Sequence, residues 1–199
     1  MLPARDNPFR MQRIEALRYR LDENSWQRLL ARFAAQHWRG VLVGPHGSGK
    51  TTLREEIETR LRADGWKVRT VILGDDRMIS WPDLRALCDG ADGRTLLCLD
   101  GLDRLSTLHW WRLRRATRTV GGILATSHVA GRLPTLHQHH TSPALLRELV
   151  RELLGDDGDS LTWTERCDTV FIRHCGDLRA CLRTFYDDVI EKPSRHVTP

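Results

Sequence analysis

One eight-residue segment, Gly44–Thr51, constrains this chain more than any other part of the sequence. Its letters, GPHGSGKT, match the spacing G-x-x-x-x-G-K-[ST], and it lies between the apolar stretch Val41–Val43 and a helical repeat of Leu53, Ile57 and Leu61. Glycines let the backbone curl so that successive N–H groups face a phosphate, and the helix N-terminus adds positive potential. The sequence therefore predicts a strand, a phosphate-binding loop and a helix in succession.

The residue types in this loop predict ATP with Mg2+ as the ligand. Lys50 is expected to bridge the β- and γ-phosphates, and Thr51 to bind the metal through its hydroxyl. Thr52 either touches the α-phosphate or is only a first-turn helix residue. The predicted nucleotide contacts come from the loop and the start of the helix: Gly44, Pro45, His46, Gly47, Ser48, Gly49, Lys50, Thr51 and Thr52.

A second apolar segment ends in an acid. Leu96–Leu99 is followed by Asp100, as expected of a strand that delivers a carboxylate to the same metal ion. The alternative is an aspartate that merely opens the turn before the next helix. With its partner motif upstream, Asp100 is predicted to be the second metal-site residue beside Thr51.

Strand-like and helix-like periods alternate through the middle of the chain, which is typical of an α/β layer fold with a parallel sheet. A helical face of Trp26, Leu29, Leu30, Phe33 and His37 precedes the first strand. Pro82 is expected to open a short helix, and Leu102–Trp111 to form another. The further predicted strands are Val68–Leu73, Thr95–Leu99, Gly122–Thr126 and Thr135–Thr141.

After Pro143 the pattern is helical only. A wide leucine stripe comes first, Thr162 with Glu165 resembles a capping box, and Asp177 is expected to cap the last helix after a stop at Gly176. We therefore predict four regions: an N-terminal segment and helix (1–40), an α/β core (41–142), a small helical lid (143–192) and a disordered tail (193–199).

Taken together, these motifs resemble those of AAA+ ATPases, a branch of the additional-strand P-loop NTPases, and most closely the origin-recognition and helicase-loader type. The resemblance rests on Gly44–Thr51, the strand ending at Asp100, the polar strand end Thr126-Ser127-His128, and Gly176-Asp177-Leu178-Arg179. It implies a three-layer fold with strand order 5-1-4-3-2. It also implies that Thr126 or Ser127 serves as sensor 1, near the γ-phosphate, and that Arg179 serves as sensor 2 from the lid.

The chain departs from the family directly after Asp100. Most AAA+ hydrolases have glutamate there to polarise the attacking water, whereas this chain has Gly101. Asp103 is the next acid and either orients the water or is only a helix N-terminal acid favoured by the dipole. The D-G-L-D letters resemble signalling NTPases of the STAND type. We therefore expect slow, partner-coupled hydrolysis, with a nucleotide switch or adaptor as the alternative.

A basic segment precedes the predicted sensor strand. In assembled AAA+ rings an arginine near this place reaches a neighbour's γ-phosphate, which makes Arg114, Arg115 and Arg118 candidates in a homo-oligomer. The same segment is also suited to nucleic-acid phosphates, with tryptophan for stacking, or is simply a solvated basic face. A macromolecular partner, protein or nucleic acid, is therefore expected.

Composition narrows the remaining classes. The net charge of +5 permits an acidic partner, and the odd number of cysteines, five, favours reduced core residues. Without an apolar run long enough for a membrane or a signal peptide, the expectation is a cytoplasmic protein.

Two further segments are candidates for function. Gly74-Asp75-Asp76-Arg77 indicates a third possible function, a small-molecule or polynucleotide kinase, or else is an aspartate-rich turn. Asn7-Pro8-Phe9-Arg10 is a candidate for packing on the base.

Overall fold

The structure is a computed structural model that describes residues 6–17, 19, 21–73, 81–155, 158 and 160–191. Its internal contacts divide the chain into two compact units. The sheet unit comprises Tyr19–Gly44 and Gly49–His139, and the helical unit comprises Met1–Arg18, Pro45–Ser48 and His140–Pro199. The loop tip Pro45–Ser48 thus groups with the helical unit, although both of its neighbours in sequence belong to the sheet unit.

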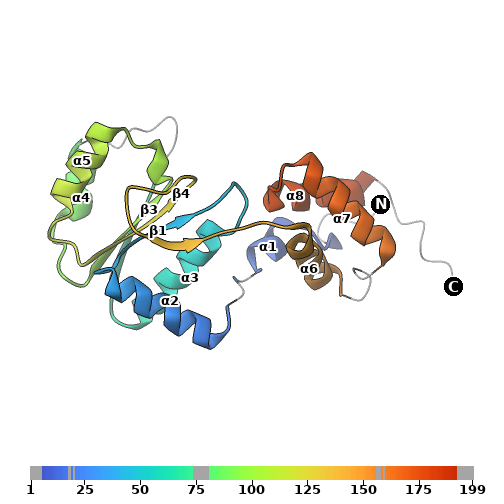
Figure 1. The fold of residues 1–199 in the computed structure, drawn as a ribbon, viewed down its shortest axis with the longest axis horizontal. Helices are drawn as coiled ribbons and strands as arrows, with labels where there is room; N and C mark the ends of the chain where they lie inside the picture. The colour runs from blue at the N-terminus through green and yellow to red at the C-terminus, as the bar shows by residue number, and fades with distance from the viewer. Residues whose placement is uncertain are drawn as a thin grey trace. The chain divides into compact units, whose positions relative to one another are not determined.

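The sheet unit is built on five parallel strands in the order β2-β3-β4-β1-β5 (Figure 1). This is the predicted order 5-1-4-3-2 read from the other edge. The phosphate-loop strand β1 lies beside β4, and β3, which carries Asp100, is one strand further out. The fifth strand is shorter than predicted. The strands are β1 (Arg39–Val43), β2 (Lys67–Ile72), β3 (Thr95–Asp100), β4 (Gly122–Ser127) and β5 (Thr135–Gln138).

The central strands are apolar on both faces because helices cover both faces. Leu42, Leu96 and Leu124 point to one side and pack with α2 (Glu23–Ala35) and α3 (Lys50–Ala63). Their strand neighbours point to the other side and pack with α4 (Trp81–Cys88) and α5 (Thr107–Ala116), as Figure 1 shows. The result is the predicted three-layer α/β arrangement.

The predicted helix over Leu102–Trp111 is wrong in its bounds. A short 3-10 helix, Leu102–Arg104, ends at Leu105, whose backbone is extended. Ser106 then caps α5 by accepting a hydrogen bond from the N–H of His109. The leucine periodicity continues across this break, which is why the pattern alone predicted one helix.

The helical unit contains α1 (Met11–Glu15), α6 (Pro143–Leu154), α7 (Leu161–Arg173) and α8 (Leu178–Glu191). The predicted capping box at Thr162 is wrong, because Ser160 caps α7 by accepting from the N–H of Trp163. Asp177 does cap α8, as predicted, through the N–H of Ala180. A buried core joins these helices: Leu146, Val150, Leu153, Cys167, Val170, Leu178, Cys181, Leu182 and Phe185.

Two further expectations are corrected in this unit. Phe9 is 1% exposed and packs against Trp163 and Phe185, so its ring belongs to a core and is not available to a base. Cys175 is exposed rather than in a core, on a backbone with positive φ. The predicted tail 193–199 lies outside the described residues. Among the described residues, no helix has both the length and the apolar character needed to span a membrane.

Candidate functional site

The phosphate-loop segment begins where β1 ends. The N–H of Gly44 donates to the carbonyl of Ser127 at 3.2 Å, which continues the pairing of β1 with β4. Beyond it, Gly47 and Gly49 have φ values of 65° and 85°, in the left-handed region that favours glycine. Such left-handed positions turn successive N–H groups to one side, which is how a backbone forms a nest for an anion.

Lys50 is the first residue of α3 and is almost buried, with 9% of its surface exposed. Its Nζ donates to the Gly44 carbonyl at 2.8 Å, so the side chain folds back along the loop. The first turn of α3 contains no acidic residue, and the positive potential of the helix N-terminus is not offset there. One ammonium group and one helix N-terminus therefore lie at the same end of the loop.

The loop tip explains why glycine stands at position 47. A Cβ added to Gly47 would lie 2.0 Å from the Asp177 Oδ1 and 2.8 Å from the Arg179 N atom, and all three residues belong to the helical unit. The same Asp177 oxygen caps α8. A side chain at position 47 would thus displace the start of α8 as well as strain its own backbone.

The two predicted metal-site residues lie together. The Thr51 hydroxyl donates to Asp100 Oδ2 at 3.4 Å, across a sequence separation of 49. A hydroxyl and a carboxylate at this spacing suit Mg2+, which prefers oxygen ligands and keeps several waters and phosphate oxygens in its shell. The residues present therefore fit the metal that the loop implies.

Thr126 is the sensor candidate that contacts this pair. Its hydroxyl donates to Asp100 Oδ1 at 2.5 Å and accepts from the N–H of Gly101 at 2.9 Å. The Ser127 hydroxyl instead donates to the Val129 carbonyl at 2.6 Å within a local turn. The structure thus brings Thr126, and not the Ser127 hydroxyl, to the predicted metal ligand.

Asp103 and His128 form a second pair, between the 3-10 helix and the end of β4. Asp103 accepts twice from His128: its Oδ1 from the backbone N–H at 3.1 Å, and its Oδ2 from Nδ1 at 3.0 Å. Burial acts to raise the pKa of Asp103, but the hydrogen bonds from His128 outweigh it and hold that pKa below its ordinary value. His128 received no role from the sequence, although it directly follows the predicted sensor residues.

The backbone conformation at Gly101 explains why no glutamate follows Asp100 in this chain. Gly101 has φ 90° and ψ 46°, where the chain leaves β3 and enters the 3-10 helix. A Cβ there would lie 3.1 Å from the Leu73 carbonyl oxygen and 3.2 Å from Arg104 Cδ. A residue with a side chain is strained in this conformation, so this turn does not accommodate a glutamate without rearrangement.

Sequence reasoning also missed a buried charge network behind the site. Arg54 and Glu58 on α3 are each 4% exposed and form an ion pair at 2.7 Å. Arg54 also lies 3.9 Å from Asp100 Oδ2, and Glu58 accepts from the Thr70 hydroxyl on β2 at 3.2 Å. The four-residue spacing on the helix was a usable signal, because it places Arg54 and Glu58 on one face.

The helical unit contains a cavity of about 560 Å³ between its N-terminal segment and α8. Arg179, the sensor 2 candidate, lines it and is itself exposed. Its other lining residues include Arg10, Arg183, Tyr186 and Asp187. The role predicted for Arg179 toward the phosphates stays a prediction.

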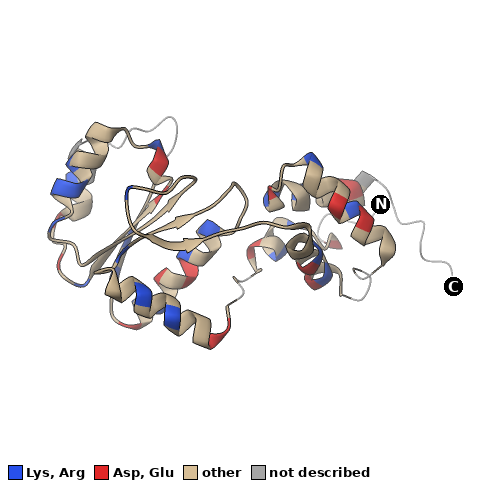
Figure 2. Cartoon of the chain, in the orientation of Figure 1, with Lys and Arg blue, Asp and Glu red and all other residues tan. Residues whose placement is uncertain are grey.

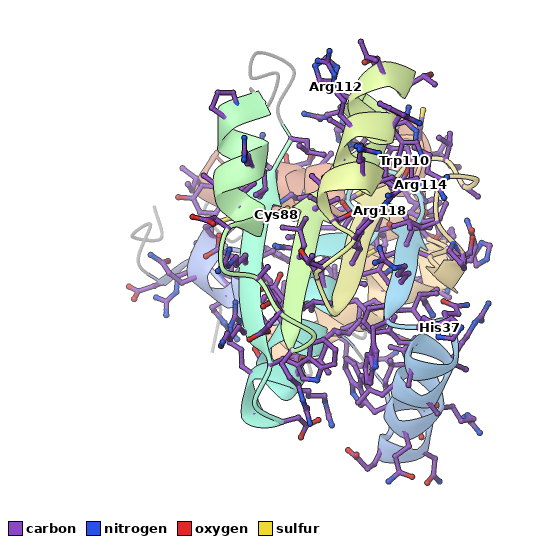
Figure 3. The ribbon with its side chains drawn as sticks, turned by 90° about the vertical axis from the view of Figure 1, so that its left-hand side faces the viewer. His37, Cys88, Trp110, Arg112, Arg114 and Arg118 are labelled. Atoms are coloured by element: carbon purple, nitrogen blue, oxygen red, sulfur yellow. The ribbon has the colours of Figure 1, made fainter. Side chains whose placement is uncertain are left out.

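The arginines predicted to reach a neighbour or a polyanion lie on α5 or directly after its end. Figure 3 shows Arg112, Arg114 and Arg118 on this segment, and Arg115 is likewise exposed. None of these four forms an ion pair with another described residue. The Gly74–Arg77 segment, on which the kinase alternative rests, lies outside the described residues.

Comparison with solved structures shows which known fold this chain resembles. No family model matches the chain, and no curated protein matches it in sequence. Solved structures of RuvB from Thermotoga maritima do match, at 17% identity. The Holliday junction branch migration motor has a TM-score of 0.58 over 86% of this chain, and a mutant form of the same protein has a TM-score of 0.60 over 88%.

The chain spans about two thirds of those RuvB structures, between 63% and 66% of their length. The identity is low, so the likeness concerns the fold. Both the strand order and the loop between β1 and α3 agree with it. The fold of this chain is therefore that of the RuvB structures, while membership of the AAA+ ATPases and the origin-recognition or loader type stay predictions.

Proposed function

We propose that the chain binds ATP with Mg2+ and hydrolyses it slowly to ADP and phosphate. The observation that carries the proposal is the arrangement of Lys50, Thr51 and Asp100. Lys50 is buried and begins α3, directly after the glycine-rich loop. The Thr51 hydroxyl lies 3.4 Å from the Asp100 carboxylate on β3, which is two strands away from β1 in the sheet. This is the donor set needed to hold a triphosphate and its metal.

Each residue has a distinct task in this proposal. Lys50 exchanges its bond to the Gly44 carbonyl for the β- and γ-phosphate oxygens. Thr51 and Asp100 hold Mg2+, which neutralises charge on the phosphates when bound. Thr126 fixes the Asp100 carboxylate through its short hydrogen bond, and we assign it the sensor 1 position in preference to Ser127.

Adenine is proposed over guanine because the sequence lacks the Asn-Lys-x-Asp motif with which many P-loop GTPases read guanine. We retain Arg179 as the sensor 2 candidate, because it is the exposed arginine that follows the α8 cap.

The decisive experiment is a nucleotide titration. A fluorescent ATP analogue, competed with ATP, ADP and GTP in the presence of Mg2+, is expected to bind the wild type, and Lys50→Ala is expected to lose most of that affinity. Phosphate release should be slow in the wild type and absent in Lys50→Ala. A folded wild-type sample that retains no nucleoside triphosphate at millimolar concentration would refute the proposal.

A switch or adaptor is the second candidate function, and Gly101 specifically favours it. The turn at Gly101 excludes the glutamate that polarises water in most AAA+ hydrolases. A switch would hold nucleotide through purification at one molecule per chain and release negligible phosphate. Measurable turnover that depends on Lys50 would select the ATPase instead.

We further propose that the partner is a nucleic acid bound on α5 and the residues that directly follow it. From Arg104 to Arg147 the sequence has seven arginines and no acidic residue, and Trp111 on α5 is 62% exposed. Figure 2 shows no acidic residue on α5, although both signs of charge occur on α3. Arginines that neutralise phosphates, with an exposed aromatic ring for base stacking, form the usual surface for a single strand.

Arg114 also adds to the positive potential around its neighbours. Burial, followed by the nearby charge of Arg114, lowers the pKa of Arg39, whose guanidinium donates to the Thr117 carbonyl. One of the RuvB neighbours is named as a Holliday junction branch migration motor, and this name supports proposing a nucleic-acid partner.

Anisotropy with a labelled single-stranded oligonucleotide tests this interface. Arg114→Gln/Arg118→Gln is expected to weaken binding and to reduce the salt slope by about two, at roughly one per phosphate contact. Arg28→Gln/Arg32→Gln, a pair with the same spacing on α2, is the control. Unchanged binding in the Arg114/Arg118 variant would refute the interface. The variant could instead keep oligonucleotide binding and lose ATP turnover only at concentrations where the chain self-associates. In that case the arginines of α5 contact the nucleotide of a neighbouring copy of the chain.

A further inference from the structure

The Asp103–His128 pair has the form of an oriented base. One carboxylate accepts from both the backbone N–H and the Nδ1 of the same histidine, at 3.1 Å and 3.0 Å. Two bonds to one residue fix both the direction of the chain after β4 and the rotation of the imidazole ring. The proton on Nδ1 leaves Nε2 as the basic nitrogen of the neutral ring, and chemistry with a ligand therefore falls to Nε2.

The carboxylate is held in its charged form. The hydrogen bonds from His128 keep the pKa of Asp103 below its ordinary value despite partial burial. A charged carboxylate stabilises the imidazolium that forms when the ring takes up a proton. The pair thus favours both states that a general base passes through.

The pair lies at the phosphate edge of the sheet. His128 follows Ser127, whose carbonyl accepts from the N–H of Gly44, the first residue of the phosphate loop. Two residues before His128, Thr126 contacts the proposed metal ligand Asp100. The carboxyl ends of parallel strands are where ligands of open α/β sheets bind. His128 is therefore attached to the same edge that holds the triphosphate in the proposed function.

The site needs such a group, because the usual one is missing. Position 101 adopts a left-handed backbone close to the Leu73 carbonyl, and the glutamate of other AAA+ hydrolases does not fit it. Among the described residues, Asp103 is the nearest acid in sequence after Asp100, and both of its oxygens are engaged by His128.

We propose that His128, positioned by Asp103, is the general base of ATP hydrolysis in this chain. The water oxygen attacks the γ-phosphorus as the bond from that phosphorus to the β,γ-bridging oxygen breaks. The water proton passes to His128 Nε2, and the leaving ADP oxygen keeps the electron pair beside Lys50. The imidazolium then releases its proton to solvent. Asp103 touches no reacting atom and is a positioning residue.

This inference rests on the proposed ATPase function, and its test separates the two. The variants are His128→Gln and Asp103→Asn. In Asp103→Asn the amide oxygen still accepts one bond, but its NH2 group faces the other donor, so the histidine tautomer is disturbed while the packing stays similar. His37→Gln, an exposed histidine just after α2, is the matched control. Single-turnover phosphate release, the Kd of an ATP analogue and Tm are measured for each protein.

Both site variants are expected to lose about 10²-fold or more in the single-turnover rate, the range of general-base catalysis, with Kd for ATP within about twofold of wild type. His37→Gln should keep the wild-type rate. The proposal is overturned if folded variants hydrolyse ATP at the wild-type rate. It is also overturned if their rate falls only in proportion to lost ATP affinity, since the pair would then be a binding or structural element. A wild type that binds no ATP would instead refute the proposed function itself.

Discussion

The turn at Gly101 offers a test of why this chain lacks the usual glutamate. Replacing Gly101 with alanine forces a Cβ into the left-handed region at φ 90°. That conformation costs a non-glycine residue about 1–2 kcal/mol. The added Cβ also meets the Leu73 carbonyl oxygen at 3.1 Å, and crowding of this kind adds about 1 kcal/mol or more. The expected loss of stability is therefore about 2–3 kcal/mol.

Alanine variants of two other glycines separate the strain of the left-handed backbone from the crowding of the added Cβ. Gly65 has a similar φ of 84°, but an added Cβ there meets no atom within 4 Å, so Gly65→Ala isolates the backbone strain. Gly93 has no positive φ and equally open surroundings, and Gly93→Ala is expected to be neutral or slightly stabilising. The three alanine variants should rank Gly93 above Gly65, and Gly65 above Gly101, in stability.

Thermal unfolding followed by circular dichroism measures the ranking. In a chain of this size, 1 kcal/mol corresponds to about 2–4 °C, so Gly101→Ala should lower Tm by about 5–10 °C and Gly65→Ala by roughly half as much. Gly101→Glu should be at least as unstable as Gly101→Ala and should not accelerate hydrolysis. A Gly101→Glu variant with wild-type Tm and faster phosphate release would refute the reasoning, because the turn would then accept a conventional glutamate.

Three further predictions follow from single contacts. Arg54→Met removes the buried partner of the 4%-exposed Glu58, which keeps the half-exposed Arg62 at 3.0 Å, and should destabilise the chain by up to about 3 kcal/mol in urea titration. Thr126→Val removes the hydrogen bond to Asp100 and should raise the Mg2+ concentration needed for half-maximal ATP turnover. Burial raises the pKa of Tyr19 to about 12. Because this folded-state pKa lies above the unfolded value, its stability contribution is complete below about pH 10 and is lost as pH rises toward 12.

Each of these three predictions has its own control measurement. Lys67→Met, which breaks an exposed pair with Asp92, should cost less than about 1 kcal/mol, and an equal cost for Arg54→Met would contradict the burial argument. Thr126→Ser keeps a hydroxyl and should need little extra Mg2+. Absorbance near 295 nm should report an ionisation near pH 12 that is absent in Tyr19→Phe; an ionisation of Tyr19 near pH 10 in the folded chain would be inconsistent with its burial.

The sequence predicted the sheet correctly because local signals determined it. The strands are apolar on both faces, so each appears as a short unbroken run, and the strand between Lys50 and Asp100 implied the observed order through the family resemblance. The meeting of Thr51 and Asp100 followed from the same reasoning. Predicted bounds were wrong where a single serine hydroxyl determined a helix start, at Ser106 and Ser160.

By itself, then, the sequence determined the phosphate loop, the layer architecture and the residue types available to bind a metal and a triphosphate, because these depend on spacing along a strand or a helix. Only the tertiary structure decided that His128 pairs with Asp103, that Arg54 lies near Asp100, and that Phe9 belongs to a core rather than to a base site. The physical reason is that these contacts depend on the register between parallel strands and on packing between distant segments. Neither leaves a periodic signal in one sequence.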